Sequence, residues 1–357
     1  MKIYIRAAAA ISPQKTFEQD PFLEEPLSYT SNRLQTFEPD YTKFIDVKAL
    51  RRMSRVIKMG VTAALGCLQE AGEKNPGAII TGTAYGCLED TETFLTQTIE
   101  RNEEMPPPTP FIQSTHNTVG AQIALILKCH QYNNTFAQGG ASFENALLDA
   151  ILLLREEEAK TVLAGSVDEL TATSFTLLKR FGLYKANEIS NLLLYGDQSK
   201  GTIAGEGAAF FLLSSEHSHD DYGLLEAMHN FYKPVNTEAI EKEIAAFLEA
   251  QSVTIADIDL IIMGKNGDSR EDSIYTHLER SLFANRQTIP YKHLCGEYPT
   301  AVSFALWMAA NILKKQTVPV VTGYIDASKK DLNRILIYNH YQNKYHSLLL
   351  LSRTTSL

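Results

Sequence analysis

The sequence has few cysteines, no long hydrophobic run and no excess of positive charge. Its four cysteines stand singly at 67, 87, 129 and 295 without a CxxC pair, a pattern that favours a reducing cytoplasm over a disulfide framework. The net charge of −9 argues against binding to nucleic-acid phosphates. Apolar runs such as 210–213 are far too short to span a bilayer, and 7–11 is too short for a signal peptide. We therefore expect a globular, cytoplasmic protein with no nucleic-acid partner and no membrane span.

The common cofactor and hydrolase motifs are also missing. The sequence contains no GxGxxG, no P-loop and no GxSxG. His293, Cys295 and Glu297 alternate with other residues, and on a strand they would share one face that a metal could use. Three ligands without a second cluster are a weak signal, and we favour a structural role for them. We accordingly expect no cofactor and no metal.

The distribution of apolar residues is typical of an α/β protein. The chain has 357 residues, of which 44% are hydrophobic, enough for one large two-lobed domain or two domains. Pro106, Pro107 and Pro108 are consecutive and predict an irregular excursion. We expect strands near 78–81, 161–165, 258–264 and 318–321, and helices over 48–71, 143–157 and 301–315.

The best boundary candidate is the polar stretch 214–221, which divides the chain into halves at 1–215 and 222–357. The two sides resemble weak copies of one plan. Ile79–Gly82 and Ile261–Gly264 are both followed by a glycine-containing turn and then by acidic residues where a helix would begin.

Four motifs carry most of the information. In chain order they are RRMSR at 51–55, AGSVDE at 164–169, GTIAGEGAAFFLL at 201–213 and KHLCGE at 292–297. The pair of glycines around Glu206 indicates close backbone packing around an acidic hydrogen-bond acceptor. Alone, this segment would be read as a turn before a strand. The order of all four is more specific, and in this order the sequence resembles the β-ketoacyl synthases of the thiolase superfamily.

That resemblance implies two similar βαβαβ-type halves, each with a five-stranded sheet, stacked into five α-β-α-β-α layers and usually dimeric. Family members acylate a cysteine and use two histidines for decarboxylation and enolate stabilisation. Here the expected cysteine position is Gly140, or Gln138 if the alignment slips by two residues. The histidine positions hold Met263 and Glu297, while the family lysine is retained as Lys292. In place of a flexible, glycine-rich gating loop the chain has the bulky stretch 338–345.

Loss of all three catalytic groups favours a silent subunit, because such groups act as a unit. We therefore expect a ketosynthase-like subunit that is not active by itself. The resemblance is to chain-length-factor partners of active ketosynthases in polyketide pathways such as those of aryl polyenes or flexirubins. Two alternatives are an acyltransferase or decarboxylase with an unrecognised site, such as Lys292 with Glu297, and a homodimer that binds acyl chains.

Two surfaces are candidates for partners. Lys48, Arg51, Arg52 and Arg55 fall at i, i+3, i+4 and i+7, which on one helix would form a basic stripe. This stripe is either a docking patch for an acyl carrier protein or a solvated face with internal salt bridges. By the resemblance, the strand at 134–138 pairs across a dimer axis, which would place Asn134, Phe136 and Gln138 at the interface or tunnel of a heterodimer.

Overall fold

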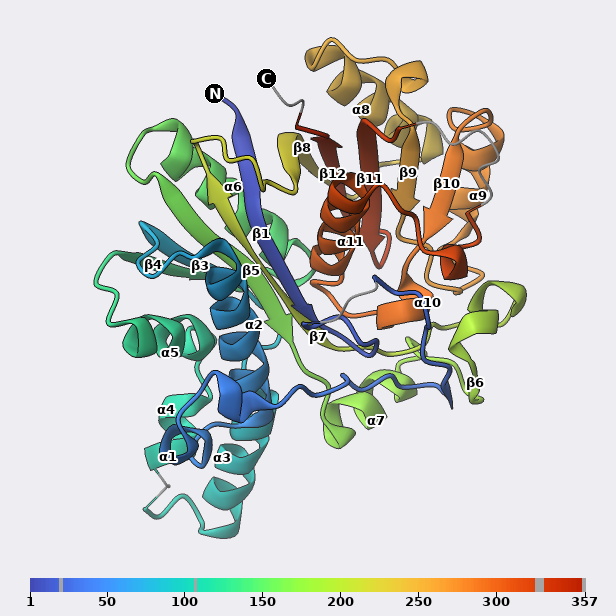
Figure 1. Ribbon diagram of the computed structural model, residues 1–357. Helices are drawn as coiled ribbons and strands as arrows, with labels where there is room; N and C mark the ends of the chain where they lie inside the picture. The colour runs from blue at the N-terminus through green and yellow to red at the C-terminus, as the bar shows by residue number, and fades with distance from the viewer. Residues whose placement is uncertain (19–21, 106–107, 325–330, 355–357) are drawn as a thin grey trace.

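The computed structural model describes residues 1–18, 22–105, 108–324 and 331–354, and its main feature is a ten-stranded mixed sheet (Figure 1). The N-terminal part contributes β1 (Ile3–Ile11), β3 (Ala78–Gly82), β4 (Tyr132–Phe136), β5 (Thr161–Asp168) and β7 (Gly207–Ser214). The C-terminal part contributes β8 (Gly223–Tyr232), β9 (Leu260–Met263), β10 (Gln287–Pro290), β11 (Arg334–Tyr341) and β12 (Tyr345–Ser352). The short strands β2 (Thr30–Ser31) and β6 (Ile189–Ser190) form a second, separate sheet.

The two parts repeat one topology. From edge to middle, the N-terminal order is β4-β3-β5-β7-β1 and the C-terminal order is β10-β9-β11-β12-β8. In each part, the strand that comes first in the chain, β1 or β8, lies innermost in the sheet. The strand that comes third in the chain among those of this sheet, β4 or β10, lies at the edge. The two five-stranded sheets that we expected are joined into one, because β1 pairs with β8 over Ile3–Ile5. The similarity between 79–82 and 261–264 thus corresponds to the equivalent strands β3 and β9.

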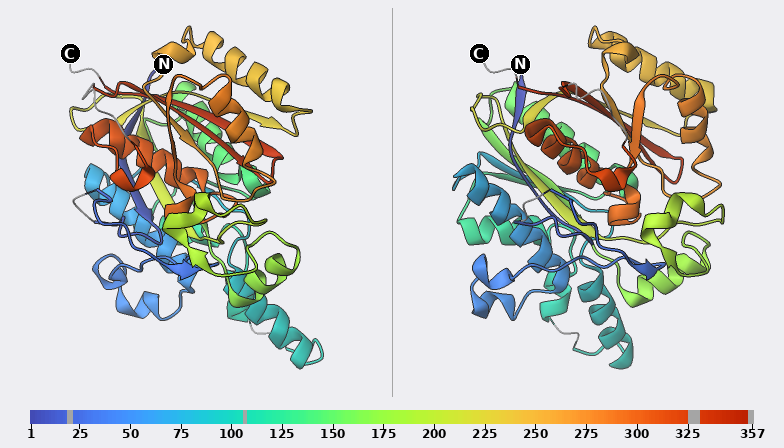
Figure 2. Two further views of the ribbon diagram at one scale, coloured as in Figure 1. Left: turned by 90° about the vertical axis from the view of Figure 1, so that its right-hand side faces the viewer. Right: turned by 45° about the vertical axis from the view of Figure 1, so that its right-hand side comes forward.

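Helices lie on both faces of each half and between the halves, which gives five layers (Figure 2). α2 (Arg55–Ala71) packs on the outer face of the N-terminal strands. α6 (Ser142–Arg155) and α11 (Val302–Lys315) fill the centre, where the inner faces of both halves share one hydrophobic core. α8 (Thr237–Ala250) and α9 (Ser273–Arg280) cover the outer face of the C-terminal strands. The thiolase-like α-β-α-β-α arrangement is confirmed.

The burial of α11 shows why it lies at the centre. The helix carries apolar residues on all its sides, and only its last two residues, Lys314 and Lys315, are not buried. A helix that is hydrophobic on all sides has to be enclosed by other elements.

Because α11 packs against strands of both halves, the two halves share the inner core. The division of the chain into domains at 215 and 222 stays a prediction. It falls between the end of β7 at Ser214 and the start of β8 at Gly223.

Two of the expected elements are wrong. The helix expected over 48–71 is interrupted: α1 (Val47–Leu50) is followed by a turn, and α2 begins only at Arg55. The strand expected at 318–321 is instead a 3-10 turn, Val320–Thr322, that follows Pro319. A proline has no N–H for a sheet ladder, which explains why the β-branched residues beside it do not form a strand.

The excursion around the prolines forms a projecting arm. It consists of α3 (Leu88–Glu100) and α4 (Pro108–Gln113), and Phe94 and Phe111 hold the two helices together with ring centroids 5.2 Å apart. Pro108 opens α4, where the missing N–H costs nothing, whereas Pro106 and Pro107 lie outside the described residues. Along the arm, α5 (Thr118–Leu127) leads back to β4. Throughout the part of the chain that the structure describes, no helix combines the length and apolar character needed to cross a bilayer.

Candidate functional site

The sequence motifs meet at one end of the N-terminal strands and hold each other in place. Glu206, just before β7, is fully buried, and its carboxylate accepts hydrogen bonds from the backbone N–H groups of Thr36 at 3.0 Å and Leu170 at 3.1 Å. Arg55 completes the arrangement with a hydrogen bond of 2.8 Å from its Nη1 to the Glu206 carboxylate, and it also pairs with Glu38. The first and third motifs are therefore parts of one ion-pair network.

This network changes the interpretation of the basic stripe. Arg55 points inward to Glu206, and α1 ends before Arg51, so the four basic residues do not form one continuous helical face. Lys48, Arg51 and Arg52 remain exposed. The carrier-protein patch is therefore reduced to these three residues, and their function stays a prediction.

The glycines of the third motif allow two segments to touch. A Cβ built on Gly205 would lie 2.1 Å from the carbonyl oxygen of Cys295 and 2.6 Å from the Cα of Gly296. No side chain fits in that space, so the GEG and CGE motifs depend on each other. The contact is secured by a hydrogen bond of 3.0 Å from the Gly205 N–H to the Glu297 carbonyl, and it places Glu297 beside the third motif.

The second motif ties the two halves together through Asp168, the last residue of β5. Its fully buried carboxylate accepts from the Thr83 hydroxyl at 2.9 Å and from the backbone N–H groups of Ala84 and Tyr85. From the C-terminal half, Thr300 donates its hydroxyl at 2.8 Å. Burial raises the pKa of Asp168, although these hydrogen bonds to the carboxylate partly oppose the effect. The role of this aspartate is to fix the turn after β3 to the start of α11.

Gly140 lies in the turn between β4 and α6, where the family nucleophile is expected, and an aromatic side chain packs against it. A Cβ on Gly140 would lie 2.7 Å from both Cβ and Cδ1 of Tyr341, so even alanine requires the neighbour to move. Tyr341 is held there by its hydroxyl, which lies 3.2 Å from the hydroxyl of Tyr85. The space beside Gly140 is thus filled from β11.

Gln138, the alternative nucleophile position, is engaged in the same turn. Its backbone N–H donates to the Ser142 hydroxyl at 2.8 Å, and its side-chain oxygen accepts from Asn145. These contacts join Gln138 to the first turn of α6, while its side chain stays exposed. Neither Gly140 nor Gln138 offers a nucleophilic atom.

Met263, which stands at one of the two expected histidine positions, does not face the site. It ends β9, and its side chain packs in the outer core of the C-terminal half. The polar group that this turn brings to the site is Asn266, which the sequence analysis missed. Its side-chain N–H group donates to the carboxylates of Glu271 at 2.8 Å and Glu297 at 2.9 Å.

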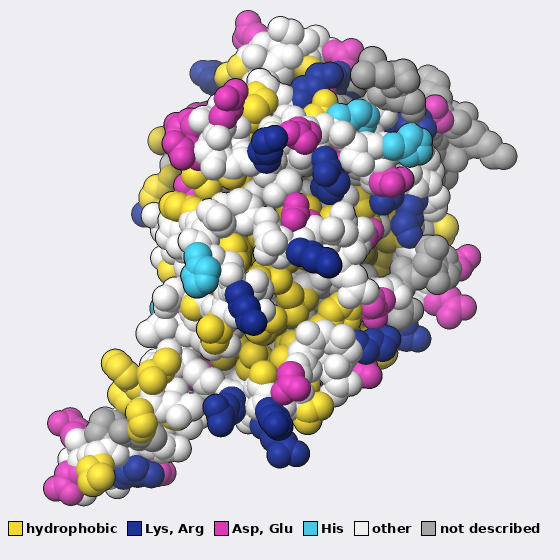
Figure 3. Space-filling model, turned by 60° about the vertical axis from the view of Figure 1, so that its left-hand side comes forward, with side chains coloured by type: hydrophobic (Ala, Val, Ile, Leu, Met, Phe, Trp, Pro, Cys, Tyr) yellow, Lys and Arg dark blue, Asp and Glu magenta, His cyan; other side chains and the backbone are white. Residues whose placement is uncertain are grey.

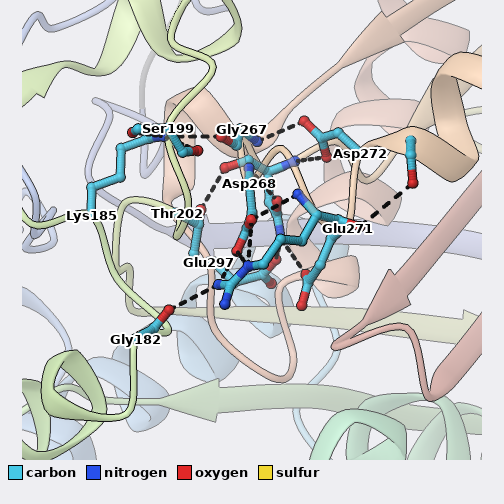
Figure 4. Close-up of polar contacts among 12 residues, drawn as sticks. Gly182, Lys185, Ser199, Thr202, Gly267, Asp268, Glu271, Asp272 and Glu297 are labelled. Atoms are coloured by element: carbon cyan, nitrogen blue, oxygen red, sulfur yellow. Dashed lines mark hydrogen bonds and ion pairs between the residues drawn. The ribbon is translucent and has the colours of Figure 1, made fainter.

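The turn from 266 to 272 is itself fixed by a dense polar network (Figure 4). Asp272 accepts from the backbone N–H groups of Asn266 at 2.9 Å and Gly267 at 2.8 Å. The ammonium group of Lys185 donates to the Gly267 carbonyl at 2.9 Å, and the hydroxyl of Thr202 donates to the Asn266 carbonyl at 2.6 Å. Asn266 is therefore held firmly where it meets Glu297.

Glu297 forms a buried ion pair with Lys292. The lysine Nζ lies 2.7 Å from Glu297 Oε2, and the two side chains are 0% and 8% exposed. Burial raises the pKa of Glu297 to about 7, although Lys292 and Asn266 partly oppose the effect. Glu297 Oε1 has no hydrogen-bond partner among the described residues. Lys292 is thus paired with Glu297, which stands at one of the two expected histidine positions.

A pocket of about 290 Å³ lies beside this pair. Its walls include apolar and aromatic groups such as Leu183, Tyr184 and Tyr341, and polar groups such as Asn266 and Glu297. The pocket does not reach Gly140, because Tyr341 stands between them. It can accommodate a small group that carries a hydrogen-bond donor for Glu297, but it offers no nucleophile.

The bulky stretch 338–345, expected as a loop in place of the family's gating loop, is mostly sheet. β11 continues to Tyr341 and β12 begins at Tyr345, so the connection is a tight hairpin in which Gln342 and Asn343 have φ angles of 52° and 48°. Tyr341 and Tyr345 pair across the ladder. The expectation of a loop over 338–345 was wrong, but a rigid element stands there in place of a flexible one.

The suggested metal face does not exist, because 292–295 forms a helical turn, α10 (Lys292–Cys295), and not a strand. His293 is buried, with its Nδ1 3.2 Å from the Tyr195 hydroxyl and its Nε2 3.2 Å from the Val321 carbonyl. Burial lowers the pKa of His293 to about 4. No group of three or more metal-ligating side chains that could hold an ion occurs within the described ranges.

The expected interface strand is an edge strand. β4 pairs with β3 only, and its other side is free within the described chain. Asn134 donates to the Tyr132 hydroxyl at 3.1 Å, and Phe136 packs partly against the central core. The dimer role of Asn134, Phe136 and Gln138 stays a prediction.

Comparison with known proteins supports the family resemblance. Residues 29–180 match the family model for the N-terminal domain of β-ketoacyl synthases. The ishigamide ketosynthase/chain length factor superposes with a TM-score of 0.83 and 18% identity over 99% of both chains. No curated protein sequence matches this chain.

Two further solved structures have the same fold. A β-ketoacyl synthase from Burkholderia phymatum STM815 gives a TM-score of 0.79 and 14% identity over 99% of this chain and 100% of that one. A structure of AntDE:AntF, in which a type II polyketide synthase acyl-carrier protein is in complex with its ketosynthase, gives 0.74 and 15% over 99% of both chains. Residues 29–180 therefore resemble the N-terminal domain of β-ketoacyl synthases, and the chain shares the thiolase-like fold of the solved ketosynthases over 99% of its length.

Proposed function

We propose that this chain is a catalytically silent, chain-length-factor-like subunit that pairs with an active β-ketoacyl synthase and forms part of its acyl tunnel. The observation that carries this proposal is the contact between Tyr341 and Gly140. Replacement of the nucleophile by glycine would leave an open site, but here an aromatic side chain occupies the space that the missing side chain would need. The site is therefore packed as part of the core.

The surface supports an association through the β4 edge. A free edge strand invites pairing with another chain, and natural proteins usually cover it. Large apolar side chains are exposed on the neighbouring arm and helix α5, including Ile99 at 75%, Met105 at 87%, Ile112 at 65% and Leu125 at 69%. The projecting arm with its hydrophobic side chains is visible in Figure 3. Exposed apolar groups at such density favour a permanent partner.

The partner that we propose is an active ketosynthase, in a polyketide pathway of the aryl polyene or flexirubin type or in fatty-acid-like synthesis. Support comes from two solved structures of similar fold. One is a ketosynthase/chain length factor, and the other is a ketosynthase in complex with its acyl-carrier protein. We expect the pair to work in the cytoplasm. Lys48, Arg51 and Arg52 are the residues through which an acidic carrier protein would approach.

The test is co-expression with an active ketosynthase encoded beside this chain, followed by size-exclusion chromatography with light scattering. We expect a heterodimer, and we expect the chain alone to be poorly soluble or to form a weaker homodimer. A stable monomer that ignores the ketosynthase would refute the proposal. A robust homodimer that excludes the ketosynthase would favour the homodimeric acyl-binding alternative.

The enzymatic alternative has one observation in its favour, the unpaired Oε1 of Glu297 beside the 290 Å³ pocket. It is tested with the purified chain and malonyl carrier-protein thioester, by measuring released carbon dioxide and, with an acyl thioester added, the condensation product. We expect neither reaction, and we expect G140C alone to restore no condensation because Met263 and Glu297 supply no imidazole. An acyl adduct on the wild-type chain with turnover would overturn the silent assignment.

A further inference from the structure

A pocket of about 520 Å³ lies between the C-terminal parts of α2 and α11, against β1. Gly66 and Gln69 line it from α2, Asn311 lines it from α11, and Ala9 lines it from β1. It shares no wall residue with the 290 Å³ pocket beside Glu297. Sites for small molecules usually have volumes of about 300–1,000 Å³. The pocket is therefore large enough for a ligand, and it is separate from the site described above.

Five aromatic side chains line this pocket, and all of them keep some accessible surface. They are Phe17, Phe22, Phe44, Tyr222 and Trp307. Phe44 is only half-buried, and the other four are 4–8% exposed. Two pairs meet edge to face: the ring centroids of Phe17 and Phe44 lie 5.3 Å apart, and those of Phe22 and Trp307 lie 5.4 Å apart. Because aromatic rings pack favourably on one another in such arrangements, these walls favour a ligand with an aromatic body.

The carboxylates of the walls are already paired. Glu18 Oε2 lies 3.4 Å from the ammonium group of Lys43, which is not a wall residue. Glu70 Oε1 lies 4.0 Å from the ammonium group of Lys314 and also accepts a hydrogen bond from the Tyr222 hydroxyl. A cationic ligand would have to compete with these partners.

One wall lysine, Lys15, has no carboxylate partner among the described residues. Its side chain is exposed, and its ammonium group lies 5.8 Å from the centroid of the Phe37 ring. Lys314, by contrast, is held 3.8 Å from the centroid of the Tyr222 ring and faces Glu70. Lys15 is therefore the cation that a ligand can reach without breaking an ion pair, and it favours an anion.

We propose that this pocket binds a small aromatic carboxylate. The aromatic body packs against the ring pairs, and the carboxylate meets the ammonium group of Lys15. A neutral aromatic molecule lacks the second contact, and a small carboxylate without a ring lacks the first. The inference does not depend on the proposed pairing with a ketosynthase, because the walls include no residue of β4 or of the Gly140 turn.

The test uses the purified full-length chain and three probes: hydrocinnamate, its neutral amide hydrocinnamamide, and propanoate, which lacks the ring. Dissociation constants are measured by ligand-observed NMR titration. The fluorescence of Trp307 reports binding at this pocket, because it is the only tryptophan in the chain. Ion pairs at exposed positions are weak, so we expect hydrocinnamate to bind about three- to fivefold more tightly than its amide. Propanoate should bind about tenfold more weakly than hydrocinnamate, or worse, because it buries no ring.

A substitution at Lys15 separates the charge from the rest of the pocket. K15Q removes the ammonium group at an exposed position, so the variant should fold and should lose the preference for the carboxylate over the amide. K242Q, at an exposed lysine on α8, is the matched control and should leave the preference unchanged. High salt should reduce the preference in the wild type, because it screens an exposed ion pair.

Equal affinities for hydrocinnamate and its amide, or an unchanged preference in K15Q, would overturn the proposal. Binding that leaves the fluorescence of Trp307 unchanged would also overturn it, because the ligand would then lie elsewhere. Tighter binding of phenethylammonium than of hydrocinnamate would favour a cation site instead. None of these results bears on the co-expression experiment, which alone decides whether a ketosynthase is the partner.

Discussion

The contact between Gly140 and Tyr341 makes a quantitative prediction about stability. G140A places a Cβ 2.7 Å from Cβ and Cδ1 of Tyr341 and 2.9 Å from its Cγ, so that one of the two residues has to move. Overpacking of this kind costs about 1–3 kcal/mol. Removal of the ring by Y341A leaves a cavity in a site where Tyr341 is only 9% exposed, and truncation of a buried aromatic residue costs about 3–5 kcal/mol.

The two changes should compensate each other in part. In the double variant, the methyl group at position 140 occupies space that the tyrosine ring has vacated. The destabilisation caused by overpacking therefore disappears. Direct neighbours have coupling energies of about 0.5–3 kcal/mol, and we expect the double variant to be about 1–2 kcal/mol more stable than the sum of the single effects. The assay is urea unfolding of the wild type, both single variants and the double variant, followed by fluorescence and circular dichroism.

A matched control separates this contact from general glycine effects. A Cβ on Gly196 meets no heavy atom within 4 Å, so G196A should change the free energy of unfolding by no more than about 0.5 kcal/mol. Additive effects at 140 and 341, or a G140A as harmless as G196A, would show that Tyr341 does not fill the nucleophile space. The reasoning behind the silent assignment would then be refuted.

Three other predictions concern charge. R55A should lower the free energy of unfolding by about 3 kcal/mol, measured in urea, because it strands the buried carboxylate of Glu206; a loss below 1 kcal/mol would contradict the network. Burial raises the folded-state pKa of Glu144 from 4.5 to about 7. The free energy of unfolding of the wild type should therefore fall by about 3 kcal/mol relative to that of E144Q as the pH rises from 4.5 to 7. A difference between the two that does not change with pH would contradict this prediction. The double variant R51E/R52E should bind the carrier protein more weakly, most clearly at low salt, and unchanged binding at both salt concentrations would leave only a solvated surface.

The fold could be predicted because the motif residues are themselves structural. Gly205 is required where two backbones touch, and Glu206 is required where several donors converge. Residues with such strict local demands identify a fold independently of the chemistry at its site. The repetition of β3 in β9 was visible for a similar reason, since β3 ends at Gly82 and β9 is followed directly by Gly264.

The site could be predicted only in part, because its decisive contacts are remote in sequence. Arg55 was assigned to a surface stripe from helical spacing, but its buried partner Glu206 lies 151 positions away. Nothing in the local sequence shows that Tyr341 packs on Gly140, or that Asn266 reaches Glu297. Met263 illustrates another limit: a count along the chain found the end of β9, but it could not show that the side chain packs in the outer core.

The buried pair of Glu297 and Lys292 carries the last prediction: a histidine cannot be placed at 297 without a change at Lys292. Lys292 is 0% exposed, and its ammonium group has the carboxylate of Glu297 at 2.7 Å as its anionic partner. E297H would leave that charge without compensation, and breaking a buried pair by removal of one partner costs about 3–5 kcal/mol. E297Q keeps the shape and one acceptor, so it should cost less, and the double variant K292M/E297H should recover part of the loss because no buried charge remains. Urea unfolding of the three variants decides the matter. If E297H is as stable as the wild type, Lys292 has another neutralising partner, and the ion pair does not explain why glutamate stands at this position.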